Sequence, residues 1–184
     1  MIKDFSKFNE SKNIGKVVFT GVAGAGKTTI LDEFEKIGYK VVDESARKLI
    51  KYYQENDQSK LPWNNRELFQ SIVENDQLQK YLNNDNCIFD RCMVDEIAYR
   101  RYNGMEVSEN LKETISTHRY DKVFIFPFWK DIYKQDSERT ETPEEAEALF
   151  NYLMKGYTES GYNPIIVPTG PIEYRTEFII DRLD

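Results

Sequence analysis

Eight residues near the N-terminus form a loop of a type that holds phosphate groups. Residues 21–28 read GVAGAGKT and match the pattern G-x-x-x-x-G-K-[ST] at every fixed position. Glycines let such a loop curl so that successive backbone N–H groups face the phosphates. Lys27 can then reach the β- and γ-phosphates, while the Thr28 hydroxyl can coordinate Mg²⁺. The residues expected to contact a nucleotide here are Gly21, Ala23, Gly24, Ala25, Gly26, Lys27, Thr28 and Thr29.

An acid and an arginine, Asp90 and Arg91, follow the apolar run 87–89. If that run is a strand of a parallel sheet, both residues lie at the carboxyl edge, where ligands of such sheets bind. Asp90 could hold Mg²⁺ through water, and Arg91 could pair with a phosphate. The structural alternative is an Asp that caps the next helix and an exposed Arg. The phosphate-binding loop already marks this edge as functional, which favours the first interpretation.

Two further acids, Asp43 and Glu44, follow the apolar run 40–42, and Arg47 lies one helical turn later. Glu44 is the candidate general base, or orienting residue, for an acceptor hydroxyl. Asp43 either contacts the acceptor or caps the following helix. We therefore take Asp43, Glu44 and Arg47 as candidate acceptor-binding residues, together with Arg91.

Asp95 and Tyr99 lie four residues apart in a helical segment, so they share one face of that helix. They either contact the acceptor or serve the fold. The polar, aperiodic segment 129–142 is predicted to be a lid that carries Arg139 onto the triphosphate. A solvated loop without such a role would have the same composition.

These candidate residues require strands that end at one edge of a sheet. Buried strands are predicted from apolar runs at 16–20, 40–42, 87–89, 122–126 and 163–167. Helical periodicity predicts helices at 27–37, 44–53, 66–82, 93–102, 107–116, 143–160 and 171–182. Strands without a polar face that alternate with helices predict a three-layer α/β/α fold with a mostly parallel sheet. We expect one domain at 15–184 and a short arm outside the core at 1–14.

The composition excludes several classes of protein. The net charge of −7 argues against a non-specific grip on nucleic acid, which needs a basic surface. Cys87 and Cys92 have no histidine partners at zinc spacing, so we predict two free thiols. His118 is the only histidine and lies in a polar stretch, which argues against a Ser-His-Asp triad. No apolar run approaches the roughly 18 residues of a membrane span, and no signal-peptide pattern occurs, so we expect a cytoplasmic protein.

Five segments of the chain resemble the NadR-type P-loop kinase and ATPase family, which includes ribosylnicotinamide kinase domains. The segments are GVAGAGKTT, VVDESAR, FDRCMVDEIAY, YDKVFIF with the following DSERTE, and GYNPIIVPTGPIEYR. They extend from Lys16 to Arg175 in the order of the family. The resemblance implies the P-loop kinase fold, with a five-stranded sheet of order 2-3-1-4-5.

The resemblance also implies roles for individual residues. Asp90-Arg91 would match the acid–arginine pair of these kinases, and Glu44 would match their acceptor-side acid. The loop that contains Thr169 and Gly170 would lie near the nucleotide base. Cys92 departs from the family, in which many members carry a small residue at this position, so the shape of the acceptor pocket does not follow from the resemblance.

The leading hypothesis is an ATP- and Mg²⁺-dependent kinase that transfers the γ-phosphoryl group to a nucleoside-like or nucleotide acceptor, with nicotinamide riboside as the leading candidate. The alternative is a nucleotide-dependent ATPase or regulatory switch, although the N-K-x-D and D-x-x-G motifs of GTPases are missing. The third hypothesis is a kinase that acts on nucleic-acid ends or modified bases, for which Arg47, Arg91, Arg100 and Arg101 would supply a basic groove. The acidic net charge counts against it, so we expect a small-molecule partner and neither nucleic acid nor membrane.

Overall fold

Five apolar segments form one sheet in the computed structural model, which describes residues 13–130 and 142–183. The strands are β1 (Lys16–Gly21), β2 (Val41–Val42), β3 (Cys87–Asp90), β4 (Lys122–Phe126) and β5 (Ile165–Ile166). Every neighbouring pair is parallel, and the order is β2-β3-β1-β4-β5. The predicted parallel sheet and its strand order are therefore confirmed.

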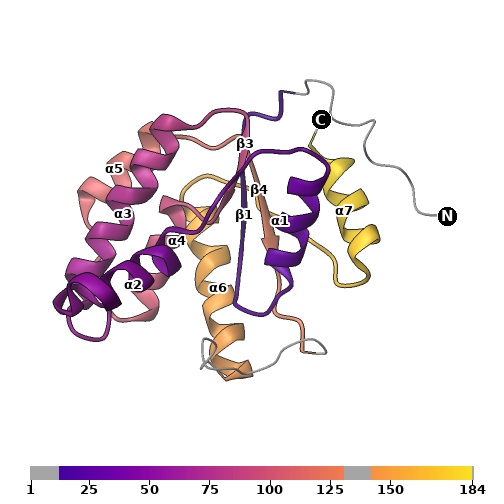
Figure 1. Cartoon of the computed structure of the whole chain (residues 1–184). Helices are drawn as coiled ribbons and strands as arrows, with labels where there is room; N and C mark the ends of the chain where they lie inside the picture. The colour runs from indigo at the N-terminus through magenta and orange to yellow at the C-terminus, as the bar shows by residue number, and fades with distance from the viewer. Residues whose placement is uncertain (1–12, 131–141, 184) are drawn as a thin grey trace.

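Helices cover both faces of this sheet (Figure 1). They are α1 (Lys27–Lys36), α2 (Ser45–Asn56), α3 (Arg66–Asn83), α4 (Met93–Tyr102), α5 (Glu109–Thr117), α6 (Pro143–Glu159) and α7 (Ile172–Ile180), and a 3₁₀ turn, η2 (Gln58–Lys60), follows α2. Helices α1 and α7 pack together on one side, whereas α3, α4 and α6 lie on the other. This arrangement is the predicted three-layer α/β/α architecture.

The residues of the central strand β1 are apolar on both faces of the sheet. Val17, Val18 and Phe19 have no exposed surface, because helices cover the sheet on each side. The ring centroid of Phe19 lies 5.3 Å from that of Phe34 on α1 and 5.6 Å from that of Phe124 on β4. This packing fixes α1 against the strand that leads into the phosphate-binding loop.

The structure moves some predicted boundaries. Ile14, which the sequence placed in an arm outside the core, is buried, and its N–H donates to Asn86 Oδ1 at 2.7 Å. Helix α5 begins two residues later than predicted, because Ser108 caps it and accepts the Leu111 N–H at 3.2 Å. Residues 1–12 of the predicted arm and 131–141 of the predicted lid lie outside the described residues. None of the helices in the described ranges is long and apolar enough to span a membrane.

Candidate active site

The phosphate-binding loop connects β1 to α1 at the carboxyl edge of the sheet, at the bottom of Figure 1. Gly21 has a φ of 138°, and a Cβ at this position would lie 2.3 Å from the Phe126 carbonyl oxygen of β4. Only glycine therefore allows the loop to pass so close to the neighbouring strand. Helix α1 begins after Gly26 without a side-chain cap or an acid in its first turn. Its first N–H groups can therefore bind an anion.

Lys27 and Asp90 meet beside this loop. The Lys27 ammonium donates to Asp90 Oδ1, and the two side chains are only 7 % and 13 % exposed. Burial lowers the pKa of Lys27 and nearby Arg91 lowers it further, while Asp90 and Glu44 oppose both effects. Cys92, rather than Asp90, is the N-cap residue of α4. The Asp95 side chain completes a capping box there by accepting from the Cys92 backbone N–H. The capping alternative for Asp90 is therefore wrong.

Arg91 and Glu44 form a second pair next to the first. Arg91 Nε lies 3.2 Å from Glu44 Oε1, and the guanidinium carbon lies 5.4 Å from the centre of the Tyr99 ring. Burial raises the pKa of Glu44, but the charges of Arg91, Lys27 and Arg47 outweigh it, so the net effect is a lowered pKa. Glu44 is therefore an ionised carboxylate at neutral pH that can accept a hydrogen bond or a proton.

The backbone of Arg91 is unusual for a non-glycine residue. Its φ of 67° lies in the left-handed region, and its N–H donates to the Phe19 carbonyl of β1 at 3.0 Å. Such a conformation costs about 1–3 kcal/mol and persists only where the surroundings enforce it. The turn after β3 thus directs the guanidinium back over the edge of the sheet, towards Glu44.

Asp95 serves the fold. It has no exposed surface, and its carboxylate accepts hydrogen bonds from three internal donors: Thr20 Oγ1, the Tyr157 hydroxyl at 2.7 Å and the Cys92 N–H at 2.8 Å. Oδ1 also lies 3.8 Å from Arg91 Nη1. These contacts favour the structural interpretation of Asp95 over the acceptor-binding one, because its buried carboxylate joins β1, α4 and α6. Tyr99 differs, since its ring lies against the Arg91 guanidinium and is partly exposed.

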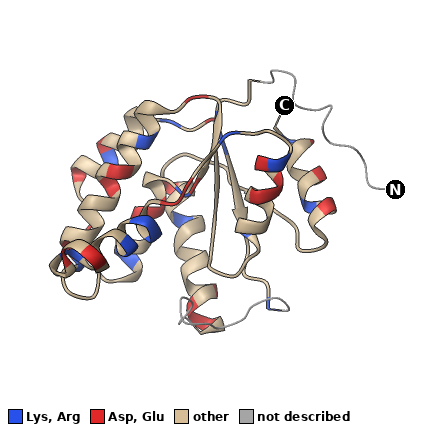
Figure 2. Ribbon diagram, in the orientation of Figure 1, with Lys and Arg blue, Asp and Glu red and all other residues tan. Residues whose placement is uncertain are grey.

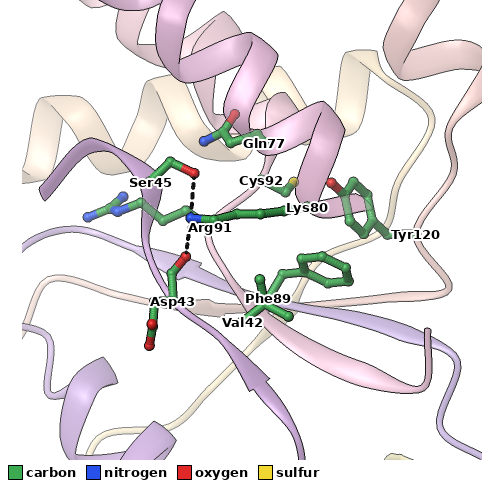
Figure 3. A pocket seen from close by; sticks show the side chains of 9 residues that line it. All are labelled: Val42, Asp43, Ser45, Gln77, Lys80, Phe89, Arg91, Cys92 and Tyr120. Carbon is green, nitrogen blue, oxygen red and sulfur yellow. Dashed lines mark hydrogen bonds between the residues drawn. The ribbon is translucent and has the colours of Figure 1, made fainter. Parts of the chain in front are cut away.

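Asp43 lies at the mouth of a narrow space between α2, α3 and the strand ends (Figure 3). Its carbonyl accepts from Lys80 Nζ at 2.8 Å, and its carboxylate pairs with Lys48. Lys80 Nζ also donates to Ser45 Oγ at 2.9 Å, so this lysine closes the space from one side. Helix α2 begins after Glu44 without a side-chain cap, so the capping alternative for Asp43 is wrong. The lining residues are Val42, Asp43, Ser45, Gln77, Lys80, Phe89, Arg91, Cys92 and Tyr120.

The remaining predicted residues lie at the same edge, with one exception. Thr28 and Thr29 are exposed at the start of α1, and Arg47 is exposed on the first turn of α2. Thr169 and Gly170 follow β5, so they also lie at the carboxyl edge of the sheet. The exception is Arg139, which lies outside the described residues.

Two residues of this edge were missed by the sequence reasoning. Tyr157 on α6 donates to Asp95, and Arg175 on α7 donates from Nη2 to the Ala25 carbonyl at 2.8 Å. Both contacts join segments that are distant in the chain. The only sequence signal was helical spacing: Tyr157 lies four residues after Leu153 and Arg175 lies three residues before Phe178, so each shares a helix side with apolar residues.

Two of the four arginines of the basic groove expected for a nucleic-acid substrate, Arg100 and Arg101, are paired with acids. Arg100 is buried and pairs with Glu67 at 2.8 Å and Glu74 at 2.5 Å, while Arg101 pairs with Glu159 at 2.6 Å. Figure 2 shows basic and acidic residues interspersed along the helices. These arginines therefore cannot act together as a phosphate-binding surface.

Metal-binding residues at this edge are few. The residues that the structure describes contain no group of three or more His, Cys, Asp or Glu placed to hold a metal ion. Thr28 and Asp90 offer one hydroxyl and one carboxylate oxygen. That sparse donor set fits Mg²⁺, which is usually bound by one or two protein ligands together with phosphates and water. Cys87 and Cys92 are buried free thiols, as predicted.

Comparisons with known proteins agree with this fold. A search of curated proteins finds no match. Among solved structures, deoxyadenosine kinase from M. mycoides with bound dATP is 19 % identical and has a TM-score of 0.65. The superposition includes 91 % of this chain and 98 % of the kinase chain. The same kinase with the products dCMP and dCDP gives a TM-score of 0.63 at 19 % identity, over 91 % of this chain and 97 % of that one. The NadR protein in complex with NR is 17 % identical, with a TM-score of 0.68, over 90 % of this chain and 49 % of that one.

These likenesses establish the fold as that of P-loop kinases. The family model described as an AAA domain matches residues 16–175, which is most of the chain and includes the phosphate-binding loop, both ion pairs of the site and Arg175. The chain therefore belongs to the AAA domain family.

Proposed function

We propose that this protein is an ATP- and Mg²⁺-dependent small-molecule kinase that phosphorylates a hydroxyl of a nucleoside-like or nucleotide acceptor. The observation that carries the proposal is the convergence of two ion pairs at one edge of the sheet. Lys27 with Asp90 lies at the phosphate-binding loop, and Arg91 with Glu44 lies beside it. Phosphoryl transfer needs such an arrangement, with a cation at the donor and an ionised acid at the acceptor.

The donor side consists of the loop and the residues around Lys27. Backbone N–H groups of the loop and of the first turn of α1 would bind the β- and γ-phosphates, and the Lys27 ammonium would turn from Asp90 towards them. Thr28 and Asp90 would hold Mg²⁺, which neutralises charge on the phosphates when bound. Thr169 and Gly170 would lie near the base, and Arg139 would approach the triphosphate.

The acceptor side is built around Glu44. Its carboxylate would accept the hydroxyl proton while the hydroxyl oxygen attacks the γ-phosphorus and the bond to the β–γ bridging oxygen breaks, which releases ADP. Arg91 would stabilise negative charge on the transferring group. Tyr99 limits the positions that the Arg91 guanidinium can take, while Asp43 and Arg47 would contact the acceptor from the start of α2.

Nicotinamide riboside is the leading candidate acceptor. The family resemblance of the sequence supports it, as does the shared fold with a NadR protein that was solved in complex with NR. Deoxynucleosides are the next candidates, because deoxyadenosine kinase shares the fold over nearly all of its length.

The proposal is tested by a thermal-shift screen with Mg²⁺ and a non-hydrolysable ATP analogue. The panel contains nicotinamide riboside, nucleosides, deoxynucleosides and nucleoside monophosphates. We expect the analogue to raise Tm, one acceptor class to raise it further, and Lys27→Met to abolish the first increase. Steady ADP formation from ATP with every acceptor omitted, and without change when acceptors are added, would instead support the ATPase or switch function.

A further inference from the structure

Arg175 on α7 is a buried cation that the proposed reaction does not use directly. Its side chain is only 3 % exposed, and Nη2 donates to the Ala25 carbonyl inside the phosphate-binding loop at 2.8 Å. The guanidinium carbon lies 5.1 Å from the ring centre of Phe126 and 5.6 Å from that of Trp129. Helix α7 packs against α1, so it holds this arginine directly behind the loop that precedes α1.

Among the described residues, no acid compensates the charge of Arg175. Within residues 13–130 and 142–183, no carboxylate forms an ion pair with it, and its Nε has no hydrogen-bond partner. Burial alone lowers the pKa of this guanidinium. A buried charge without an acid partner is costly to the folded protein, because interaction with two aromatic rings replaces only part of its hydration. Arg175 therefore does not stabilise the fold through an ion pair with any described residue.

The hydrogen bond to Ala25 has a geometric consequence for the loop. The peptide bond between Ala25 and Gly26 is planar and trans, so its C=O and N–H groups point in opposite directions. Arg175 holds the carbonyl towards α7, and the Gly26 N–H must therefore point away from α7. Gly26 has a φ of 72° and lacks the Cβ that would restrict rotation of this peptide. The hydrogen bond from Arg175 therefore restrains a peptide that Gly26 would otherwise leave free to rotate.

We propose that Arg175 is a positioning residue that fixes the Ala25–Gly26 peptide so that the Gly26 N–H is available to a nucleotide phosphate. The inference rests on the proposed nucleotide site and goes beyond it, since Arg175 acts through the loop. The residue would also place a positive charge behind the loop, where it favours an anionic ligand. Its contribution is thus to nucleotide affinity rather than to the stability of the free protein.

The test compares Arg175→Met with the wild type in the full chain. The probe is Mg²⁺ with a non-hydrolysable ATP analogue, its Kd is measured by isothermal titration calorimetry, and Tm is measured without ligand. We expect the Kd to weaken at least 10-fold, with the Tm of the free protein unchanged or raised. Arg175→Lys keeps the charge and a donor, so it should recover most of the affinity. The matched control is Arg182→Met, because Arg182 follows the same helix but donates to the Phe178 carbonyl of α7.

Each outcome of this test decides whether Arg175 positions the loop for nucleotide binding or serves only the fold. A Kd within twofold of wild type in Arg175→Met overturns the inference and leaves the nucleotide site intact. A variant that is unfolded or strongly destabilised without ligand also overturns it, because Arg175 would then be a structural residue. If the wild-type protein itself does not bind the analogue, the proposed nucleotide site fails, and the inference fails with it.

Discussion

Replacing Glu96 by glutamine is expected to stabilise the protein increasingly as the pH rises from 5 to 8. Glu96 lies on α4 beside the Asp95 network and is 3 % exposed. Its Oε1 accepts a hydrogen bond from Gln77 Nε2 at 3.0 Å, which a glutamine carbonyl at position 96 could also accept. Burial, followed by the charges of Asp95 and Glu74, raises the pKa of Glu96 from 4.5 to about 8. Glu96 is therefore mostly protonated in the folded protein at neutral pH.

The sign and size of the effect follow from proton linkage. Between pH 4.5 and about 8 the unfolded chain has lost the Glu96 proton while the folded protein still holds it. Raising the pH therefore favours unfolding, by about 1.4 kcal/mol for each pH unit within this window. Over the three units from pH 5 to pH 8 the difference amounts to about 3.5 kcal/mol, because the slope is smaller close to each pKa. Above the folded-state pKa both states are ionised, and the effect levels off.

The assay is urea unfolding of wild type and Glu96→Gln at pH 5, 6, 7 and 8. The free energy of unfolding of the variant minus that of wild type should increase with pH at close to the stated slope. Glu113→Gln, at an exposed glutamate on α5, is the matched control, and the rise with pH should be larger in Glu96→Gln than in this variant. A Glu96→Gln difference that rises no more with pH than that of the control would refute the reasoning, because Glu96 would then titrate alike in the folded and unfolded chain.

Three other substitutions test separate parts of the account. Glu44→Gln should lower kcat for acceptor phosphorylation by about 10²- to 10⁴-fold with the nucleotide Kd nearly unchanged. Glu55→Gln, at an exposed position on α2, should keep both values. Equal rates in the two variants would contradict the role of Glu44. Tyr157→Phe removes a donor from the buried Asp95 carboxylate, so it should lower the free energy of unfolding by about 1.5–3 kcal/mol in urea titrations; a loss below about 0.5 kcal/mol would mean that this bond contributes little. Gly21→Ala places a methyl group against the Phe126 carbonyl of β4, so it should lower the free energy of unfolding by about 2–4 kcal/mol. A variant with the Tm of the wild type would contradict this expectation.

Local patterns in the sequence were sufficient to predict the sheet and the phosphate-binding loop. The run around Val17 and Phe19 is apolar because β1 is covered on both faces, and such a run is visible without a structure. Gly21 belongs to a motif whose spacing is itself the signal. Residues that follow strands, such as Asp90 and Glu44, could be assigned to one edge as soon as the strands were parallel.

Contacts between distant segments could not be predicted in this way. Asp95 was a helical neighbour of Tyr99 in the sequence, and only the packing of α4 on α6 brings the Tyr157 hydroxyl to its carboxylate. Arg175 and Ala25 are 150 residues apart, and they meet because α7 packs against α1. The left-handed backbone at Arg91 has no local signature, because nothing in the residue type favours it.

The most direct test of the central claim is transfer of label from [γ-³²P]ATP to an acceptor in the presence of Mg²⁺. The account predicts labelled product with nicotinamide riboside or another nucleoside-like acceptor, in proportion to the ADP formed. It also predicts that the label transfer is lost in Lys27→Met. Label that appears only as inorganic phosphate, at a rate that no acceptor in the panel changes, would contradict the account.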